Sequence, residues 1–140
     1  MATNEPEYYI GVMSGTSLDG VDVALVECQQ SSSRLITHYC HPMPDSLKQQ
    51  VTKISTGQAQ SIKTFGELDH QLGQLFADAV LALLALPECT IEHTKIRAIG
   101  NHGQTVFHQP EGETPFTLQL GDANIIAART GIETIAEFRR

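Results

Sequence analysis

The sequence predicts an α/β domain in which a mixed sheet opens with an antiparallel meander and is flanked by helices. Short β-rich runs separated by turn residues occupy positions 8–41. Two stretches with the apolar spacing of helices follow, at 45–55 and 61–86. Beyond position 95, strand-like and helical stretches alternate, which is typical of a sheet with helices packed on it.

The length and composition are those of one soluble domain, 1–140. Hydrophobic residues make up 41% and charged residues 18% of the 140 positions, as in a globular rather than a disordered protein. The net charge of −7 argues against a nucleic-acid partner, which needs a basic surface. The longest apolar run, 79–86, is too short to span a bilayer, and the polar start, 1–7, is no signal peptide, so no membrane partner is expected. Three scattered cysteines suggest neither disulfides nor a zinc site and favour a reducing, cytoplasmic compartment: Cys28, Cys40 and Cys89.

The first half of the chain is predicted to form three strands and two helices. The strands of the meander cover 8–12, 21–27 and 34–41. The helix at 45–55 is indicated by Leu47, Val51 and Ile54, which share one face. In the longer helix, Ser61 is the expected N-cap and Pro87 ends the segment. Its broad apolar stripe consists of Phe65, Leu68, Leu72, Leu75, Phe76, Ala79, Val80 and Leu83.

The second half alternates strands with one short helix. A buried strand at 95–100 is expected to deliver Asn101-His102-Gly103-Gln104 at its end. The helix at 123–130 has Asp122 as its expected N-cap and Gly131 as its C-cap. The remaining strands are predicted at 105–108, 115–120 and 132–136.

The hairpin at 8–26 is the first candidate site. Asp19-Gly20 is typical of a tight turn with positive φ, and Gly15 allows a ligand to approach the backbone. Backbone N–H groups without bulky side chains over them suit phosphate oxygens, and Asp19 or Asp22 could lie near a Mg²⁺ ion. The candidates for phosphate contact are Gly15, Thr16, Ser17, Leu18 and Gly20.

The alternative to a phosphate site is that this segment is only a structural hairpin turn. Two better-known signatures are absent from it. The chain has no GxxxxGK[ST] loop, and residues 11–15 are one position off the GxSxG spacing of a serine hydrolase.

The stretch at 101–105 is the second candidate site. An imidazole and an amide released at a strand end and hinged by Gly103 suit hydrogen bonds to sugar hydroxyls. His102 and Gln104 are kept as candidate sugar contacts because they fall in a stretch that carries the family resemblance described below. The alternative is a structural turn with a satisfied histidine, and His93 and His108 are assigned to that class.

The last two residues, Arg139 and Arg140, could pair with a carboxylate or a phosphate of the substrate. The alternative for them is a solvated basic end. Six acidic residues on predicted helices or loops are interpreted as solvated: Asp45, Glu67, Asp69, Asp78, Glu88 and Glu92.

Three stretches, in this order, resemble the anhydro-N-acetylmuramic acid kinases, a family of bacterial cell-wall recycling enzymes. They are Met13-Ser14-Gly15-Thr16-Ser17-Leu18-Asp19-Gly20-Val21-Asp22, Ala98-Ile99-Gly100-Asn101-His102-Gly103-Gln104-Thr105 and Glu137-Phe138-Arg139-Arg140. The resemblance implies one lobe of the two-lobed actin/hexokinase-like fold, whose ribonuclease H-like sheet opens with such a meander. It also implies that 15–22, Val21 included, is the ATP segment.

The resemblance further implies coupled chemistry on a small-molecule sugar. Water attacks the anomeric carbon of 1,6-anhydro-N-acetylmuramic acid while the freed O6 takes the γ-phosphate of ATP, with Mg²⁺ as cofactor. The general-base Asp is expected beyond residue 140, as is the second lobe, because members of the family are much longer. We therefore expect no catalytic base among these residues, an inactive fragment, and a homodimer as one possibility for the full-length protein.

Two other interpretations stay open. The chain could belong to another sugar or acetate-type kinase of the same superfamily, or to a non-catalytic, actin-like nucleotide-binding interaction domain. The hairpin also lacks the leading Asp of the DxGGT-type loops in related sugar kinases. That absence leaves open which carboxylate holds the metal.

Overall fold

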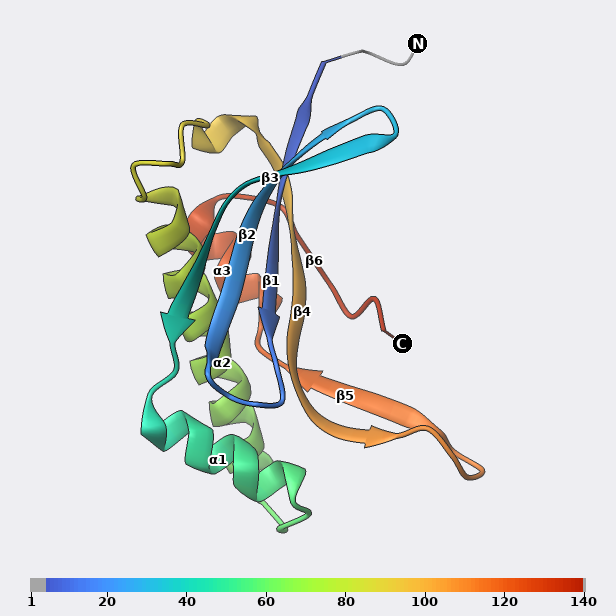
Figure 1. Cartoon of the computed structure of the whole chain (residues 1–140). Helices are drawn as coiled ribbons and strands as arrows, with labels where there is room; N and C mark the ends of the chain where they lie inside the picture. Colours follow the sequence, from blue (N-terminus) through green and yellow to red (C-terminus); the bar gives the residue numbers. More distant parts are fainter. Residues whose placement is uncertain (1–4, 140) are drawn as a thin grey trace.

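A computed structural model describes residues 5–139 of the chain. Its sheet and helices follow the predicted order closely (Figure 1). The strands are β1 (Glu7–Ser14), β2 (Gly20–Gln29), β3 (Ser32–Pro42), β4 (Ile96–Gln109), β5 (Phe116–Leu120) and β6 (Thr134–Ala136). The helices are α1 (Asp45–Ser55), α2 (Ile62–Leu84), the 3₁₀ turn η1 (His93–Lys95) and α3 (Ala123–Thr130).

The six strands form one mixed sheet in the order β3-β2-β1-β4-β5, with β6 paired to β4. β1, β2 and β3 are joined as an antiparallel meander, whereas β1 and β4 run parallel, as do β4 and β6. In Figure 1 the helices gather on one side of this sheet. The predicted fold class, a mixed sheet that opens with a meander and is flanked by helices, is confirmed.

The core lies between α2 and the face of the sheet that α2 covers. Along the strands burial alternates, as it must when only one face is packed: Ile10 and Val12 are buried and Gly11 is exposed. The predicted stripe of α2 is confirmed, and Phe76 at its centre has no exposed surface. Burying such a side chain contributes about 1.5–3 kcal/mol. α1 adds Leu47 and Val51 to the same core.

The helix caps form as the sequence predicts. The Thr64 N–H donates to Ser61 Oγ at 3.1 Å, and the Asn124 N–H donates to Asp122 Oδ1 at 2.9 Å. Gly131 adopts the left-handed conformation at φ +72°, which ends α3. α2 ends at Leu84, two residues before the predicted end.

The main difference from the prediction concerns β4, which is one continuous strand of 14 residues. The residues at 101–104 were expected to leave the sheet between two shorter strands. They stay in it because β4 is paired along this stretch: β1 pairs with it up to Gln104, and β5 pairs with it from Gln104 onward. The turn signal of Gly103 appears instead as a register shift within the strand.

Candidate functional site

The turn of the β1–β2 hairpin lies at 15–18, earlier in the chain than the predicted turn at Asp19-Gly20. Its hydrogen bond runs from the Leu18 N–H to the Gly15 carbonyl at 3.2 Å, and the positive φ, 57°, falls on Leu18. Gly20 was expected to supply that conformation, and this was wrong, because Gly20 already belongs to β2. It is a glycine for a different reason: a Cβ there would lie 2.7 Å from the His41 carbonyl oxygen on β3.

The side chains around this turn divide into exposed and buried ones. Thr16 and Ser17, at its tip, are exposed, as is Asp19. Ser14, the last residue of β1, is 2% exposed, and its hydroxyl donates to the Gln104 side-chain carbonyl. The turn can therefore present small polar groups to a ligand, whereas Ser14 faces the interior.

A register shift of the β-bulge kind sets the position of His102. Val12 pairs with Asn101 and Met13 with Gly103, so His102 is the extra residue on β4. Gly103 has φ +78°, and a Cβ there would meet the Leu120 carbonyl oxygen at 2.7 Å, so only glycine fits. Bulges redirect side chains, and this one leaves His102 partly exposed between buried neighbours.

His102 and Arg139, both predicted substrate residues, are in contact. Arg139 Nη1 lies 3.2 Å from His102 Nε2, and His102 Nδ1 lies 3.0 Å from the Gly103 carbonyl oxygen. Because a guanidinium only donates and a carbonyl only accepts, both contacts are satisfied by the neutral imidazole with its proton on Nδ1. Phe138 packs beside the ring, with centroids 6.3 Å apart. Arg140 lies outside the described residues.

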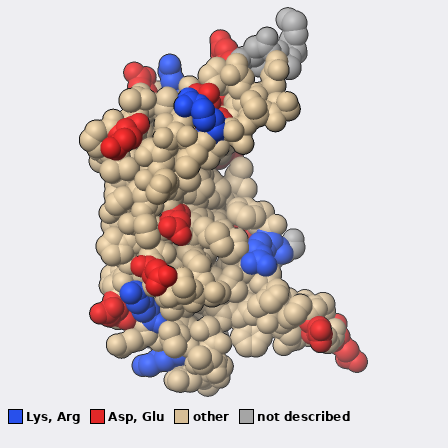
Figure 2. Space-filling view, viewed as in Figure 1, with Lys and Arg blue, Asp and Glu red and all other residues tan. Residues whose placement is uncertain are grey.

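A groove on the face of the sheet away from α2 extends from the stem of the β1–β2 hairpin to His102. It encloses about 630 Å³, and residues of the hairpin stem, Met13 and Asp22, line it together with His102 and Phe138. Figure 2 shows the molecule hollowed on its right-hand side, where uncharged residues predominate. The volume falls within the range of small-molecule sites.

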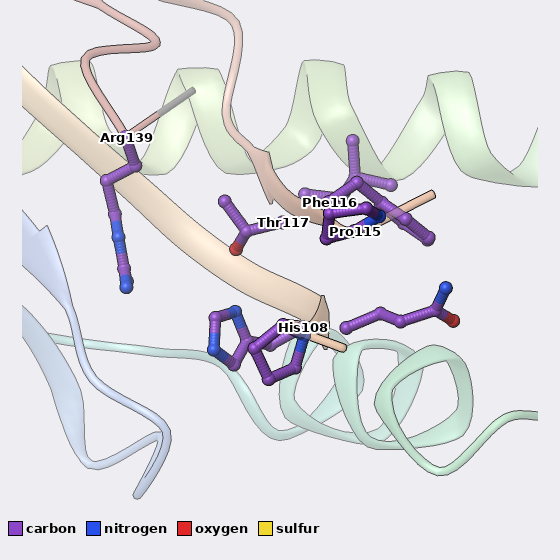
Figure 3. A pocket seen from close by; sticks show the side chains of 8 residues that line it. His108, Pro115, Phe116, Thr117 and Arg139 are labelled. Carbon is purple, nitrogen blue, oxygen red and sulfur yellow. The ribbon is translucent and has the colours of Figure 1, made fainter. Parts of the chain in front are cut away.

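A second hollow of about 590 Å³ lies beside the β4–β5 hairpin (Figure 3). His108, Phe116 and Thr117 line it, and Arg139 extends along its edge. Phe116 stacks on Phe107, with ring centroids 5.5 Å apart. The lining of this hollow is mainly apolar.

The acidic residues of the hairpin are the candidates for a metal. No group of three or more potential metal-ligating side chains occurs among residues 5–139. In nucleotide sites one or two carboxylates and the phosphates share a Mg²⁺ ion. Asp22 lines the groove and hydrogen-bonds to Cys40. Desolvation first, and then this bond to Asp22, raise the pKa of the Cys40 thiol.

Sequence reasoning missed two residues that hold the site together. Asp69 was interpreted as solvated, which is wrong: it is half-buried, and its Oδ1 accepts the Gly121 N–H at 2.8 Å. Asn101, 2% exposed, donates to the Gly121 carbonyl at 3.2 Å and accepts the Gly103 N–H at 3.2 Å. The sequence of α2 contains a signal that another part of the chain passes close to Asp69. Gly73, one helical turn after Asp69, leaves room for the backbone at Asp122, whose carbonyl oxygen would lie 2.8 Å from a Cβ at position 73.

The other acidic residues in that group are mostly exposed, as predicted. Glu67 pairs with Lys63 on the surface of α2, and Asp78 lies 2.7 Å from Arg129 of α3. Among the described residues the cysteines are free thiols. None of the described helices combines the length and the apolar character needed to cross a membrane.

The sequence matches the family model described as anhydro-N-acetylmuramic acid kinase over residues 7–140. The chain belongs to this family. Three relatives carry the same description. The protein from Vibrio vulnificus (strain CMCP6) is 63% identical over 134 residues, and the one from Vibrio cholerae serotype O1 is 60% identical over 136. The protein from Pasteurella multocida is 50% identical over 133 residues.

These alignments cover 95–97% of the chain but only 35–36% of each of the three relatives. The chain therefore spans about a third of the length of the relatives that it matches. The resemblance carried by the three motifs is confirmed at the level of the family.

Proposed function

We propose that this chain supplies the ATP-phosphate hairpin and part of the sugar site of a kinase that opens the 1,6-anhydro ring of anhydro-N-acetylmuramic acid and phosphorylates O6. One observation carries the proposal. The groove of about 630 Å³ brings Asp22, from the hairpin stem, and His102, from the candidate sugar motif, into one site. Family membership favours the same reaction and ATP as the phosphate donor.

The hairpin segment at 15–22 binds the phosphates in this proposal. Phosphoryl transfer needs positioning and charge neutralisation more than covalent chemistry, and a turn of small residues suits the first task. Thr16 and Ser17 are exposed at the tip. The Leu18 N–H already serves the turn, so Leu18 contributes shape rather than a donor.

Asp22 is the carboxylate that we favour for Mg²⁺, because it lines the groove, and Asp19 is the second candidate. When bound, Mg²⁺ neutralises charge on the transferred phosphoryl group. The carboxylates of the chain fit that ion, since few protein ligands are needed when phosphates complete the shell.

His102 and Arg139 bind the sugar in this proposal. The guanidinium of Arg139 can pair with the lactyl carboxylate, and its contact with His102 fixes the direction from which it approaches. Arg140 is a second candidate for that pairing. Gln104 was predicted to contact the sugar directly, but its exposed fraction of 1% favours an indirect role.

The remaining machinery is proposed to lie outside this chain. We propose that the Asp that activates the water, and the second lobe that closes over the nucleotide, follow residue 140. On this proposal the 140-residue chain alone is inactive, the complete enzyme is cytoplasmic, and a homodimer is its oligomeric state to test.

The test is a product analysis on the protein expressed from its complete reading frame. Incubation with ATP, Mg²⁺ and 1,6-anhydro-N-acetylmuramic acid should give a sugar that has gained one phosphate and one water by mass spectrometry. Asp22→Asn should slow the reaction strongly, and Asp45→Asn, an exposed change on α1, serves as the matched control. A folded, ATP-binding protein that leaves the sugar unchanged would refute the substrate assignment and favour another kinase or a non-catalytic domain.

A further inference from the structure

The two candidate sites are joined by a buried polar contact between β1 and β4. Ser14 directly precedes the phosphate turn, and Gln104 follows the His102–Gly103 bulge. The Ser14 hydroxyl donates to Gln104 Oε1, and Gln104 Nε2 donates to the Thr105 carbonyl at 3.2 Å. The side chains are 2% and 1% exposed.

The bulge is what turns Gln104 inward. Side chains alternate between the two faces of a strand, so the partner of Ile10, Ile99, and the partner of Val12, Asn101, face the helices. In a regular strand His102 would pair with Met13 instead, and Gln104 would fall on the opposite face. The register shift restores its pairing with buried Ser14.

An apolar pair would serve the core at this position, as Ile10 and Ile99 do earlier in the same two strands. Leaving either polar group without its partner would cost about 1–3 kcal/mol, so the pair must be complete. The hydrogen-bonded pair differs from an apolar pair because a hydrogen bond has a preferred distance and angle. It therefore fixes the position of the end of β1 relative to the bulge, whereas apolar contacts do not.

The geometry points to Ser14 and Gln104 as a positioning pair that holds the phosphate turn at a fixed distance from the His102 bulge. This inference rests on the proposed function, in which the turn binds ATP and the bulge binds the sugar. In-line transfer requires the γ-phosphate and O6 to be aligned, and misplacement by about 1 Å can cost about a hundredfold in rate. Neither residue touches a ligand in this role.

The test compares Ser14→Ala, Gln104→Met and the double variant in the protein expressed from its complete reading frame. Each single change leaves a buried polar group without a partner, so both should lower the melting temperature. The double change replaces both by apolar groups and should recover much of that loss. Thr130→Val is the matched control, because it removes a buried hydroxyl that bonds to the Ile126 carbonyl on α3.

If the pair positions the site, kcat should stay low even in the double variant, whose stability is largely restored. All three variants should lose about tenfold or more in kcat at a temperature where they are folded, with KM for ATP and sugar nearly unchanged. The double variant should be no slower than the singles, and Thr130→Val should keep its kcat.

Recovery of kcat together with stability in the double variant would show a merely structural pair and overturn the inference. Losses of kcat that multiply in the double variant would show that the two residues act independently, and they would overturn the inference too.

If a single variant does not fold, the double variant decides alone: kcat near that of the unmodified protein refutes the pair, and a tenfold loss supports it. If the unmodified protein forms no phosphorylated sugar, the proposed function fails and this role fails with it. If it forms the product and the variants keep kcat, only this inference fails.

Discussion

Gly121, between β5 and α3, offers a sharp test of how the site is packed. It has φ +121°, and a Cβ there would lie 2.2 Å from Cε2 and 2.7 Å from Cδ2 of the buried Phe76 ring. Forcing a methyl group into a filled core costs about 1–3 kcal/mol, and a backbone conformation that suits only glycine adds about 1–3 kcal/mol. Gly121→Ala should therefore lower the free energy of unfolding by about 2–6 kcal/mol, measured by urea denaturation of the 140-residue chain.

Two further variants separate the clash from the backbone strain. Gly131 also has a positive φ, +72°, but no atom lies within 4 Å of the position that a Cβ would take there, so Gly131→Ala should cost only about 1–2 kcal/mol. Adding Phe76→Leu to Gly121→Ala removes the ring atoms that clash, and the double variant should lose less than the two single losses combined. Equal losses at the two glycines, or strict additivity in the double variant, would refute this account of the packing.

Three other contacts can be tested by single substitutions. Because the bond to Asp22 helps to raise the pKa of Cys40, Asp22→Asn should speed alkylation of that thiol at pH 8, with the other cysteines unchanged in peptide mapping; an unchanged rate would contradict the role of this bond. The raised pKa means that this thiol supports stability below its ordinary pKa and that the support is lost as pH rises through the folded value. Asp69→Ala removes an acceptor from the Gly121 N–H and should cost about 1.5–3 kcal/mol in urea denaturation, whereas Asp69→Asn keeps an acceptor and should cost less; equal losses would contradict this. Ser61→Ala removes the cap of α2 and should cost about 1 kcal/mol by the same measurement, and no loss would show that the cap is dispensable.

The sequence predicted most of the fold because its signals are local. The stripe of α2, the caps at Ser61 and Asp122 and the left-handed Gly131 each depend on residues within a few positions of one another. Such patterns can be recognised without knowing what packs against them.

The errors arose where distant strands decide the local structure. Gly103 indicates a break when taken alone, but pairing with β1 and β5 keeps β4 intact across it. Gly20 is required by the close approach of β3 rather than by the turn. Asp69 has its partner at Gly121, 52 positions along the chain.

The candidate site was predicted in part. The contact between His102 and Arg139 joins two residues singled out from separate motifs, but no spacing in the sequence predicts that they meet. The pairing of Ser14 with Gln104 depends on the bulge, which only the register of two strands reveals.

The extra residue in β4 also decides which changes in chain length the protein can tolerate. Beyond the bulge Ser14 pairs with Gln104, and both are buried. Deleting His102 would remove the bulge but keep this pairing, so the side chains after it would stay on the same faces of the sheet. Val106, now 1% exposed, would remain in the core. Such a deletion should take the imidazole out of the groove and spare the packing, so the site could be lost without the fold.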